Sequence, residues 1–184
     1  SEVLLFIIPL LSMRLMSEEK RAKTDQLLMT SPVSITGLVL GKFLAALAIY
    51  GIALAVTVVY AVILTFFATP EWAVIVGNIF GSLIMGAAMI AICLLISACT
   101  ESQIIAAIGG LAAMLFLWMI ENVASLLPTS LSWLGNIISQ LSFSSRYDNF
   151  CNGILNISDV LFYISAIVVF LFFNVRIIEK RRWS

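Results

Sequence analysis

Long apolar stretches separated by short polar segments dominate the sequence. Because about 20 apolar residues in a helix cross a bilayer, a stretch of that length predicts one transmembrane span. The shorter apolar run 3–15 contains Pro9 and predicts the end of a further helix over 1–16. The full spans are expected at 35–67, 72–98, 104–127 and 159–178. The pattern therefore predicts an all-α, polytopic bundle of transmembrane helices that forms a single domain over residues 1–184.

The charged segment 17–34 predicts a short helix outside the membrane. Ser17 is suited to cap its start, and Glu18 and Glu19 fall in the first turn, where the helix dipole favours acids. Leu27 and Leu28 make its second half apolar before Pro32 ends it. Two interpretations fit: a solvated interfacial segment, or a docking element for another protein.

The loop 128–158 is too long for a plain turn. Its apolar residues follow helical spacing and predict an amphipathic helix that lies in, or dips into, the outer leaflet. These residues are Leu131, Trp133, Leu134, Ile137, Ile138 and Leu141.

The basic residues indicate the orientation, because Lys and Arg flanks stay in the cytoplasm. All of them except Arg146 fall beside 17–34 or near the C-terminus. If these segments and the turn that holds Glu101 and Gln103 are cytoplasmic, the alternation of the spans is satisfied. We therefore expect a cytoplasmic tail at 179–184, and one more helix before Ser1 to give six spans.

Composition excludes several classes of protein. Apolar residues make up 62% of the chain and charged residues 11%, with a mean hydropathy of +1.12, so the main solvent is lipid. The net charge of zero gives no field for nucleic acid. Three cysteines without C-x-x-C spacing and the lack of histidine leave no metal site or Ser-His dyad to expect. We expect no cofactor in this chain and no enzymatic activity.

Small residues recur at four-residue spacing, which allows helices to approach closely in lipid. The double glycine Gly109-Gly110 lies in mid-span and is either a packing site or a hinge. The spaced pairs are Gly37 with Gly41, Gly77 with Gly81, and Ser82 with Gly86.

Glu121 is the one carboxylate away from the first residue of a predicted span, which makes it a functional candidate. It lies 18 residues past Gln103, roughly 27 Å up a helix and near the outer face. Glu121 is therefore either wetted at the interface or paired with Arg146. A pair predicts that charge reversal at either site lowers activity and that the double swap restores part of it.

The run 18–33, EEKRAKTDQLLMTSPV, and the LGK at 40–42 resemble a segment of ABC transporter permeases of the type-2 exporter family. The family pattern is roughly E-E-[RK]-x-x-G-T-x-E-x-L-L-x-x-P-[VI] followed by L-G-K. Lys23 and Gln26 stand where Gly and Glu are usual. The turn 97–103 also looks like the family's cytoplasmic turn between two helices. The stretch 143–183 resembles the outer loop, last helix and tail of its gliding-motility-like branch, so the resemblance covers nearly the whole chain.

The resemblance implies that 17–34 is the coupling helix of a permease that receives the stroke of a cytoplasmic ATPase. It implies two ATPase copies that carry ATP and Mg, a second permease chain as homo- or heterodimer, and a bacterial inner membrane with its lipid as surroundings. The expected coupling residues are Glu18, Glu19, Lys20, Arg21, Thr24, Leu27 and Leu28.

The sequence bears separately on the energy source. It contains no G-x-x-x-x-G-K-[ST] loop, so ATP would have to be bound by another chain. The expected function is therefore an exporter permease without its own ATP site. The alternative is a channel or secondary transporter that works without an ATPase.

Overall fold

The structure is a computed structural model that describes Ile8 and residues 34–64, 66, 72–100, 102–126, 143–154 and 156–182. Its helices confirm the expected all-helical class. They are α3 (Ile35–Leu64), α4 (Trp72–Cys99), α5 (Gln103–Leu126), α7 (Phe143–Cys151) and α8 (Ile157–Arg182).

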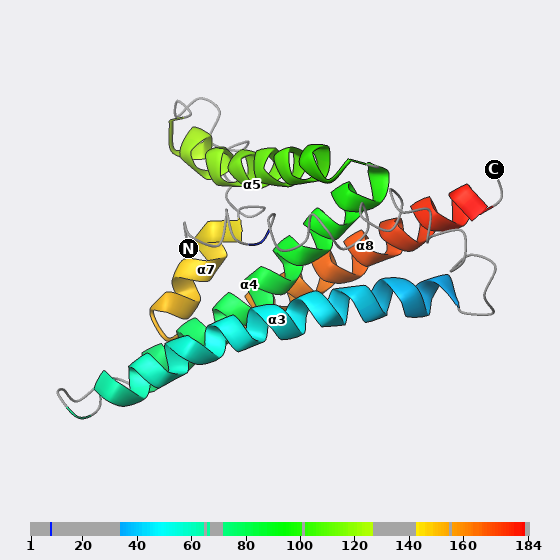
Figure 1. Ribbon diagram of the computed structural model, residues 1–184. Coiled ribbons are helices and arrows are strands. Elements are labelled where there is room, and N and C mark those ends of the chain that lie inside the picture. The colour runs from blue at the N-terminus through cyan, green and yellow to red at the C-terminus, as the bar shows by residue number, and fades with distance from the viewer. Residues whose placement is uncertain are drawn as a thin grey trace.

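Helix α4 forms the centre of the bundle. It contacts α3, α5, α7 and α8, and α3 also contacts α8 (Figure 1). From Met85 to Leu94 every residue of α4 is buried, as expected for a helix that is apolar on all sides. Ile8, from the N-terminal run, is 1% exposed and belongs to the same core.

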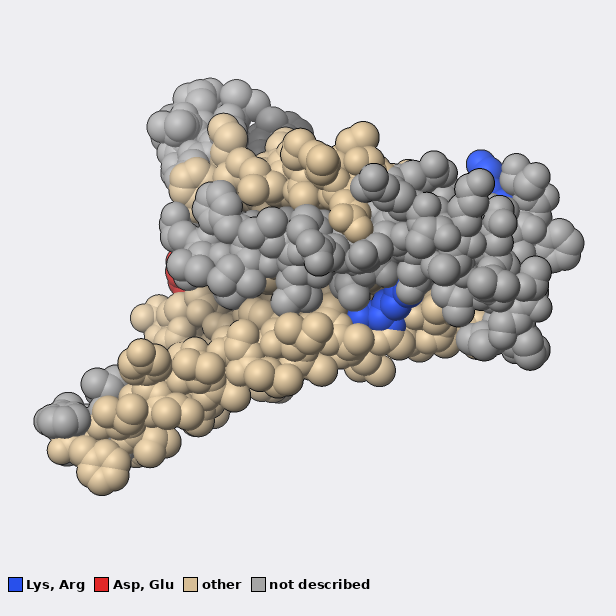
Figure 2. Space-filling model, viewed as in Figure 1, with Lys and Arg blue, Asp and Glu red and all other residues tan. Residues whose placement is uncertain are grey.

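Among the described residues, three helices are long and apolar enough to cross a membrane: Ile35–Ile63, Trp72–Cys99 and Ile157–Lys180. In α5 the described apolar stretch, Gln103–Met119, is shorter than these three. Helices α3 and α8 leave large apolar side chains exposed, among them Ile52 and Val168. The face in Figure 2 is correspondingly almost free of charge along α3, as suits a surface that contacts lipid.

The helix directions alternate as the sequence analysis expected. In Figure 1 the start of α3 and the ends of α4 and α8 lie toward one end of the bundle, and α7 lies toward the other. Helix α5 is inclined to the other long helices and contacts α4 and α7.

The small residues of α4 are contact points for aromatic rings. A Cβ on Gly81 would lie 2.6 Å from Cβ of Phe150, and a Cβ on Gly77 would lie 2.8 Å from the Phe150 carbonyl oxygen. A Cβ on Gly86 would overlap the Tyr50 ring of α3. Gly41, in contrast, has no atom of the described residues within 4 Å of its Cβ position.

Two expected features lie outside the described residues: the segment 17–34, except for Ser34, and the amphipathic helix of Leu131 to Leu141. Within the loop 128–158, the structure instead describes α7, which the sequence analysis did not predict as a helix. Gly153 ends this element with a φ of 73°, a conformation that glycine adopts without strain. Its N–H donates to the Phe150 carbonyl at 3.0 Å.

Candidate functional site

A partly buried ion pair joins α7 to the start of α8. The Nη1 of Arg146 lies 2.7 Å from Oδ1 of Asp159, and Asn149 donates from Nδ2 to Oδ2 of the same carboxylate at 2.8 Å. Asp159 is only 4% exposed and lies in the first turn of α8, where the helix dipole favours a negative charge. Both oxygens of the carboxylate therefore have partners, as a buried charge requires.

Aromatic rings surround this pair. The Arg146 guanidinium lies 4.3 Å from the centroid of the Phe162 ring, within the range of a cation–π interaction. Phe143 packs edge-on against Phe162 and Tyr163, and the Tyr163 hydroxyl donates to the Phe143 carbonyl oxygen. Charge, ring packing and a hydrogen bond to the backbone all fix α7 to α8.

A second polar cluster ties α7 to α4. The Tyr147 hydroxyl donates to Oδ1 of Asn78 at 3.2 Å, so the Ser82 hydroxyl, 2.9 Å away, donates to Tyr147. Cys151 donates its S–H to the same Asn78 oxygen at 3.2 Å. Asn78 and Ser82 are four residues apart on one face of α4 and lie beneath α7.

The same cluster reaches α3. The Tyr50 hydroxyl donates to the backbone carbonyl of Ser82 at 3.0 Å, beside the point where its ring packs on Gly86. Helices α3, α4, α7 and α8 are thus connected through polar contacts at the α7 end of the bundle.

Burial raises the pKa of Tyr147 above its ordinary value of 10.0, and the neighbouring Cys151 and Asp148 raise it further, while the hydrogen bond with Ser82 opposes them. The phenol therefore stays neutral at physiological pH and keeps the proton that it donates to Asn78.

One polar side chain in α8 has no such partners. Asn174 is fully buried, and its amide nitrogen and oxygen form no hydrogen bond in the part of the chain that the structure describes. An unsatisfied buried group of this kind costs about 1–3 kcal/mol. The sequence analysis did not single it out, although an Asn inside an apolar run was the available signal.

The polar groups of the two clusters are suited to fixing helices rather than to chemistry. The described residues contain no group of three or more His, Cys, Asp or Glu side chains that could hold a metal ion. The carboxylate of Asp159 accepts hydrogen bonds from Arg146 and Asn149, and neither of these side chains is a nucleophile.

The residues predicted from the sequence fall into two groups. The coupling residues 18–28 and Glu101 lie outside the described residues. Gln103 is described and is the first residue of α5. The backbone carbonyl of Ser102, just before it, accepts from the Ala106 N–H at 3.0 Å in the first turn of this helix. The backbone of Glu121 belongs to α5, but its side chain is not among those described. The Glu121–Arg146 pair thus stays a prediction.

The sequence analysis did not name Asp159 as a partner of Arg146, nor Asn78 and Ser82 as partners of Tyr147. The available signal was the presence of Asn78 and Ser82 at helical spacing inside an otherwise apolar span. Such residues in a membrane helix are usually paired with other polar groups.

The fold and the two polar clusters define a multi-pass helical membrane protein in which the short helix α7 lies between α5 and α8 in the chain. The family model for "ABC-2 family transporter protein" matches residues 3–178, and the chain belongs to that family. It is accordingly a membrane component of a transporter, as the sequence motifs indicated. Neither the curated proteins nor the solved structures that were searched gave a match.

Proposed function

We propose that this chain is the permease subunit of an ATP-driven exporter and moves its substrate with the energy of a separate cytoplasmic ATPase. The observation that carries this proposal is the family match, which spans residues 3–178 and so covers nearly the whole chain. The ATPase would bind ATP and Mg, since the permease sequence has no phosphate-binding loop of its own.

The coupling contact is assigned to the segment 17–34. Glu18, Glu19 and Lys20 contact the ATPase in this proposal, with Arg21 and Thr24 beside them, and Leu27 and Leu28 anchor the segment to the membrane helices. The start of α3 supports the assignment, because the Ser34 hydroxyl accepts from the Gly37 N–H at 3.3 Å and caps the helix directly after Pro32. Helix α3 thus begins directly at the end of the proposed coupling segment.

Transmission to the opposite end follows from the packing. Helix α3 contacts both α4 and α8, and these two helices hold α7 through the polar clusters. A push at the start of α3 would therefore reposition α7 at the far end, where the proposal places the substrate exit.

The proposal also includes the membrane, the orientation of the chain and its partner chains. The protein would lie in a bacterial inner membrane with the C-terminus, the turn at Glu101 and Gln103, and the segment 17–34 in the cytoplasm. It would work as a dimer with a second permease chain and bind two ATPase subunits.

The experiment is charge reversal of the coupling segment in the intact permease–ATPase complex. Glu18→Lys with Glu19→Lys is expected to reduce permease-stimulated ATP hydrolysis by about tenfold or more, the effect of losing two charged contacts at an interface. Glu71→Lys is the matched control and should leave hydrolysis unchanged, because Glu71 lies between the predicted spans 35–67 and 72–98 and so on the side of the membrane opposite to 17–34. Membrane insertion should be normal in both variants, and normal hydrolysis in the double reversal would refute the coupling role.

A further inference from the structure

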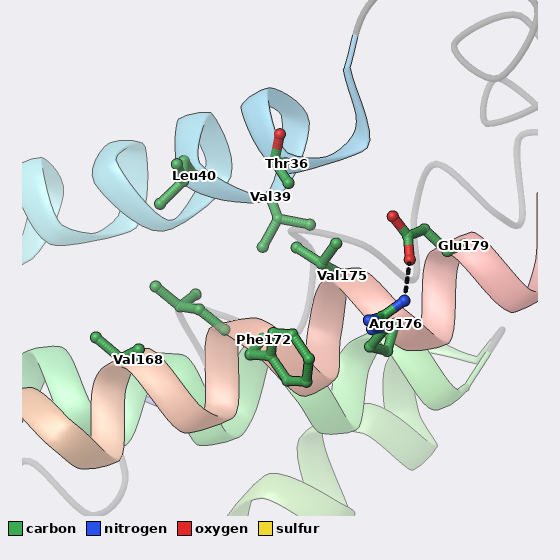
Figure 3. Close-up of a pocket in the computed structure, with 9 residues that line it drawn as sticks. Thr36, Val39, Leu40, Val168, Phe172, Val175, Arg176 and Glu179 are labelled. Carbon is green, nitrogen blue, oxygen red and sulfur yellow. Dashed lines mark hydrogen bonds and ion pairs between the residues drawn. The ribbon is translucent and has the colours of Figure 1, made fainter.

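A groove of about 440 Å³ lies between the first turns of α3 and the last part of α8. Figure 3 shows Thr36, Val39 and Leu40 of α3 on one side and Val168, Phe172 and Val175 of α8 on the other. Its volume lies within the range of about 300–1,000 Å³ that is typical of sites for small ligands.

The groove is apolar along its length and charged at one end. Its α8 wall contains Val168, Phe172 and Arg176, spaced four residues apart on one helix face, followed by Glu179. From Val168 to Arg176 the wall runs roughly 12 Å along the helix axis. The groove is thus apolar along most of its length and reaches the basic side chain of Arg176 close to the end of α8.

Two contacts hold the Arg176 side chain at this end of the groove. Its guanidinium lies 5.1 Å from the centroid of the Phe172 ring, and its Nη1 lies 3.3 Å from Oε2 of Glu179. The Arg176 side chain is nevertheless 64% exposed, so it remains accessible to another anion. Lys180, Arg181 and Arg182 follow in the sequence and give this end of the helix a positive excess.

The surroundings identify the occupant. Both walls belong to helices that are long and apolar enough to cross the membrane, and Leu40, Val168 and Phe172 are about half exposed or more. In a bilayer, acyl chains contact such side chains. Basic residues at the cytoplasmic end of a span attract anionic headgroups.

We propose that the groove binds one anionic phospholipid of the cytoplasmic leaflet, with an acyl chain between α3 and α8 and the headgroup phosphate at Arg176. This site goes beyond the transport function and rests only on the proposed orientation of the C-terminus. Because its walls are α3 and α8, the lipid would brace the helix that directly follows the segment 17–34.

The test counts lipids bound to the purified full-length protein by native mass spectrometry. Phosphatidylglycerol and phosphatidylcholine with identical acyl chains are each added in detergent at equal concentration. The wild-type protein should retain one phosphatidylglycerol with about fivefold preference over phosphatidylcholine, the ratio that one Lys or Arg near a membrane surface supplies. Equal retention of the two lipids, or retention of neither, would overturn the proposal.

Variants separate the headgroup from the groove. Arg176→Gln should abolish the preference for phosphatidylglycerol, whereas Glu179→Gln should increase it by removing a competing anion. Lys180→Gln is the charge control, because Lys180 does not line the groove, and it should keep most of the preference.

The neighbouring valines give a matched control for the apolar part. Val168→Trp fills the groove and should reduce binding of both lipids severalfold, while Val169→Trp, also on the exposed surface but outside the groove, should bind as the wild type does. Equal binding by the two Trp variants would refute the site. Loss of a dimer in Val168→Trp on size exclusion, with lipid binding unchanged, would instead assign the groove to a second copy of the chain.

Discussion

Asp159, at the start of α8, links this helix to α7 through its side chain. It is nearly fully buried, and its two carboxylate oxygens bind Arg146 of α7 and Asn149 of the same helix. A buried charge that loses its partner is far more costly than an exposed one, because it stays desolvated without compensation.

Asp159→Asn should therefore lower the free energy of unfolding by about 3 kcal/mol, since Arg146 is left partly buried without its carboxylate. For a chain of this size that corresponds to a fall on the order of 10 °C in the apparent Tm. The measurement is thermal unfolding of the detergent-solubilised protein. Asp148→Asn, an exposed neighbour on α7, is the matched control and should shift the Tm by a degree or so at most; equal shifts would show that the ion pair contributes little.

The burial of Tyr147 should make the stability of the fold depend on pH in the alkaline range. Its pKa is raised in the folded protein, chiefly by burial, so above pH 10 the unfolded chain loses the phenol proton while the folded chain keeps it. The stability that Tyr147 contributes is therefore fully present and independent of pH below pH 10, and it is lost as the pH rises through the alkaline range.

The Tm of the wild type should consequently drop more steeply between pH 10 and 11 than that of Tyr147→Phe. At pH 7 the variant should already be less stable by about 1 kcal/mol, because Asn78 and Ser82 lose a partner. Parallel pH profiles for the two proteins would contradict a buried, neutral Tyr147.

Sequence reasoning located single polar residues but not their partners. It identified Glu121 and Arg146 as unusual, yet the structure gives Arg146 a partner, Asp159, that lies only 13 residues further along the chain. The pairing depends on α7 turning back against α8, which no periodicity in 143–151 indicates. Asn174 went unnoticed because a single amide does not interrupt an apolar run.

At the scale of elements, α7 owes its position to two glycines of α4. Gly77 and Gly81 bring the backbone and ring of Phe150 into direct contact with the α4 backbone, so that Tyr147 can reach Asn78 and Ser82. The four-residue spacing of small residues predicted close approach, and the contact is made by a short helix rather than by another long helix.

Gly81→Ala should destabilise the protein by about 1–3 kcal/mol, because its Cβ would lie 2.6 Å and 2.8 Å from Cβ and Cγ of Phe150. The matched substitution Gly41→Ala meets no atom of the described part of the chain within 4 Å and should be neutral or stabilising by up to about 1 kcal/mol through helix propensity. Thermal unfolding of both variants under identical conditions is the measurement. A Gly81→Ala protein as stable as Gly41→Ala would mean that α7 is free to move away.

The long helices were the predictable elements, because a bilayer requires runs of apolar residues that sequence alone displays. Helix α7 was not predictable in the same way. Its stability comes from Phe150, Tyr147 and Arg146 binding to other helices, since nine residues are too few for a stable isolated helix.

For the whole molecule, the alternation of helix directions connects the sequence to the function. The start of α3 and the ends of α4 and α8 gather at one end of the bundle, where the basic residues of the C-terminus also lie. The opposite end contains α7 and its polar ties. A coupling segment before α3 would therefore act on several helices together, and the bundle would pass its motion to the other side of the membrane.

The central claim is that this bundle is driven by a separate ATPase. The most direct test purifies the intact protein from its native membrane in mild detergent, identifies the accompanying chains by mass spectrometry and measures ATP hydrolysis in the eluate. We predict a co-purifying soluble subunit with a phosphate-binding loop, and hydrolysis that requires this subunit. A permease that purifies without such a subunit and without hydrolysis would contradict the account and favour a channel or secondary transporter.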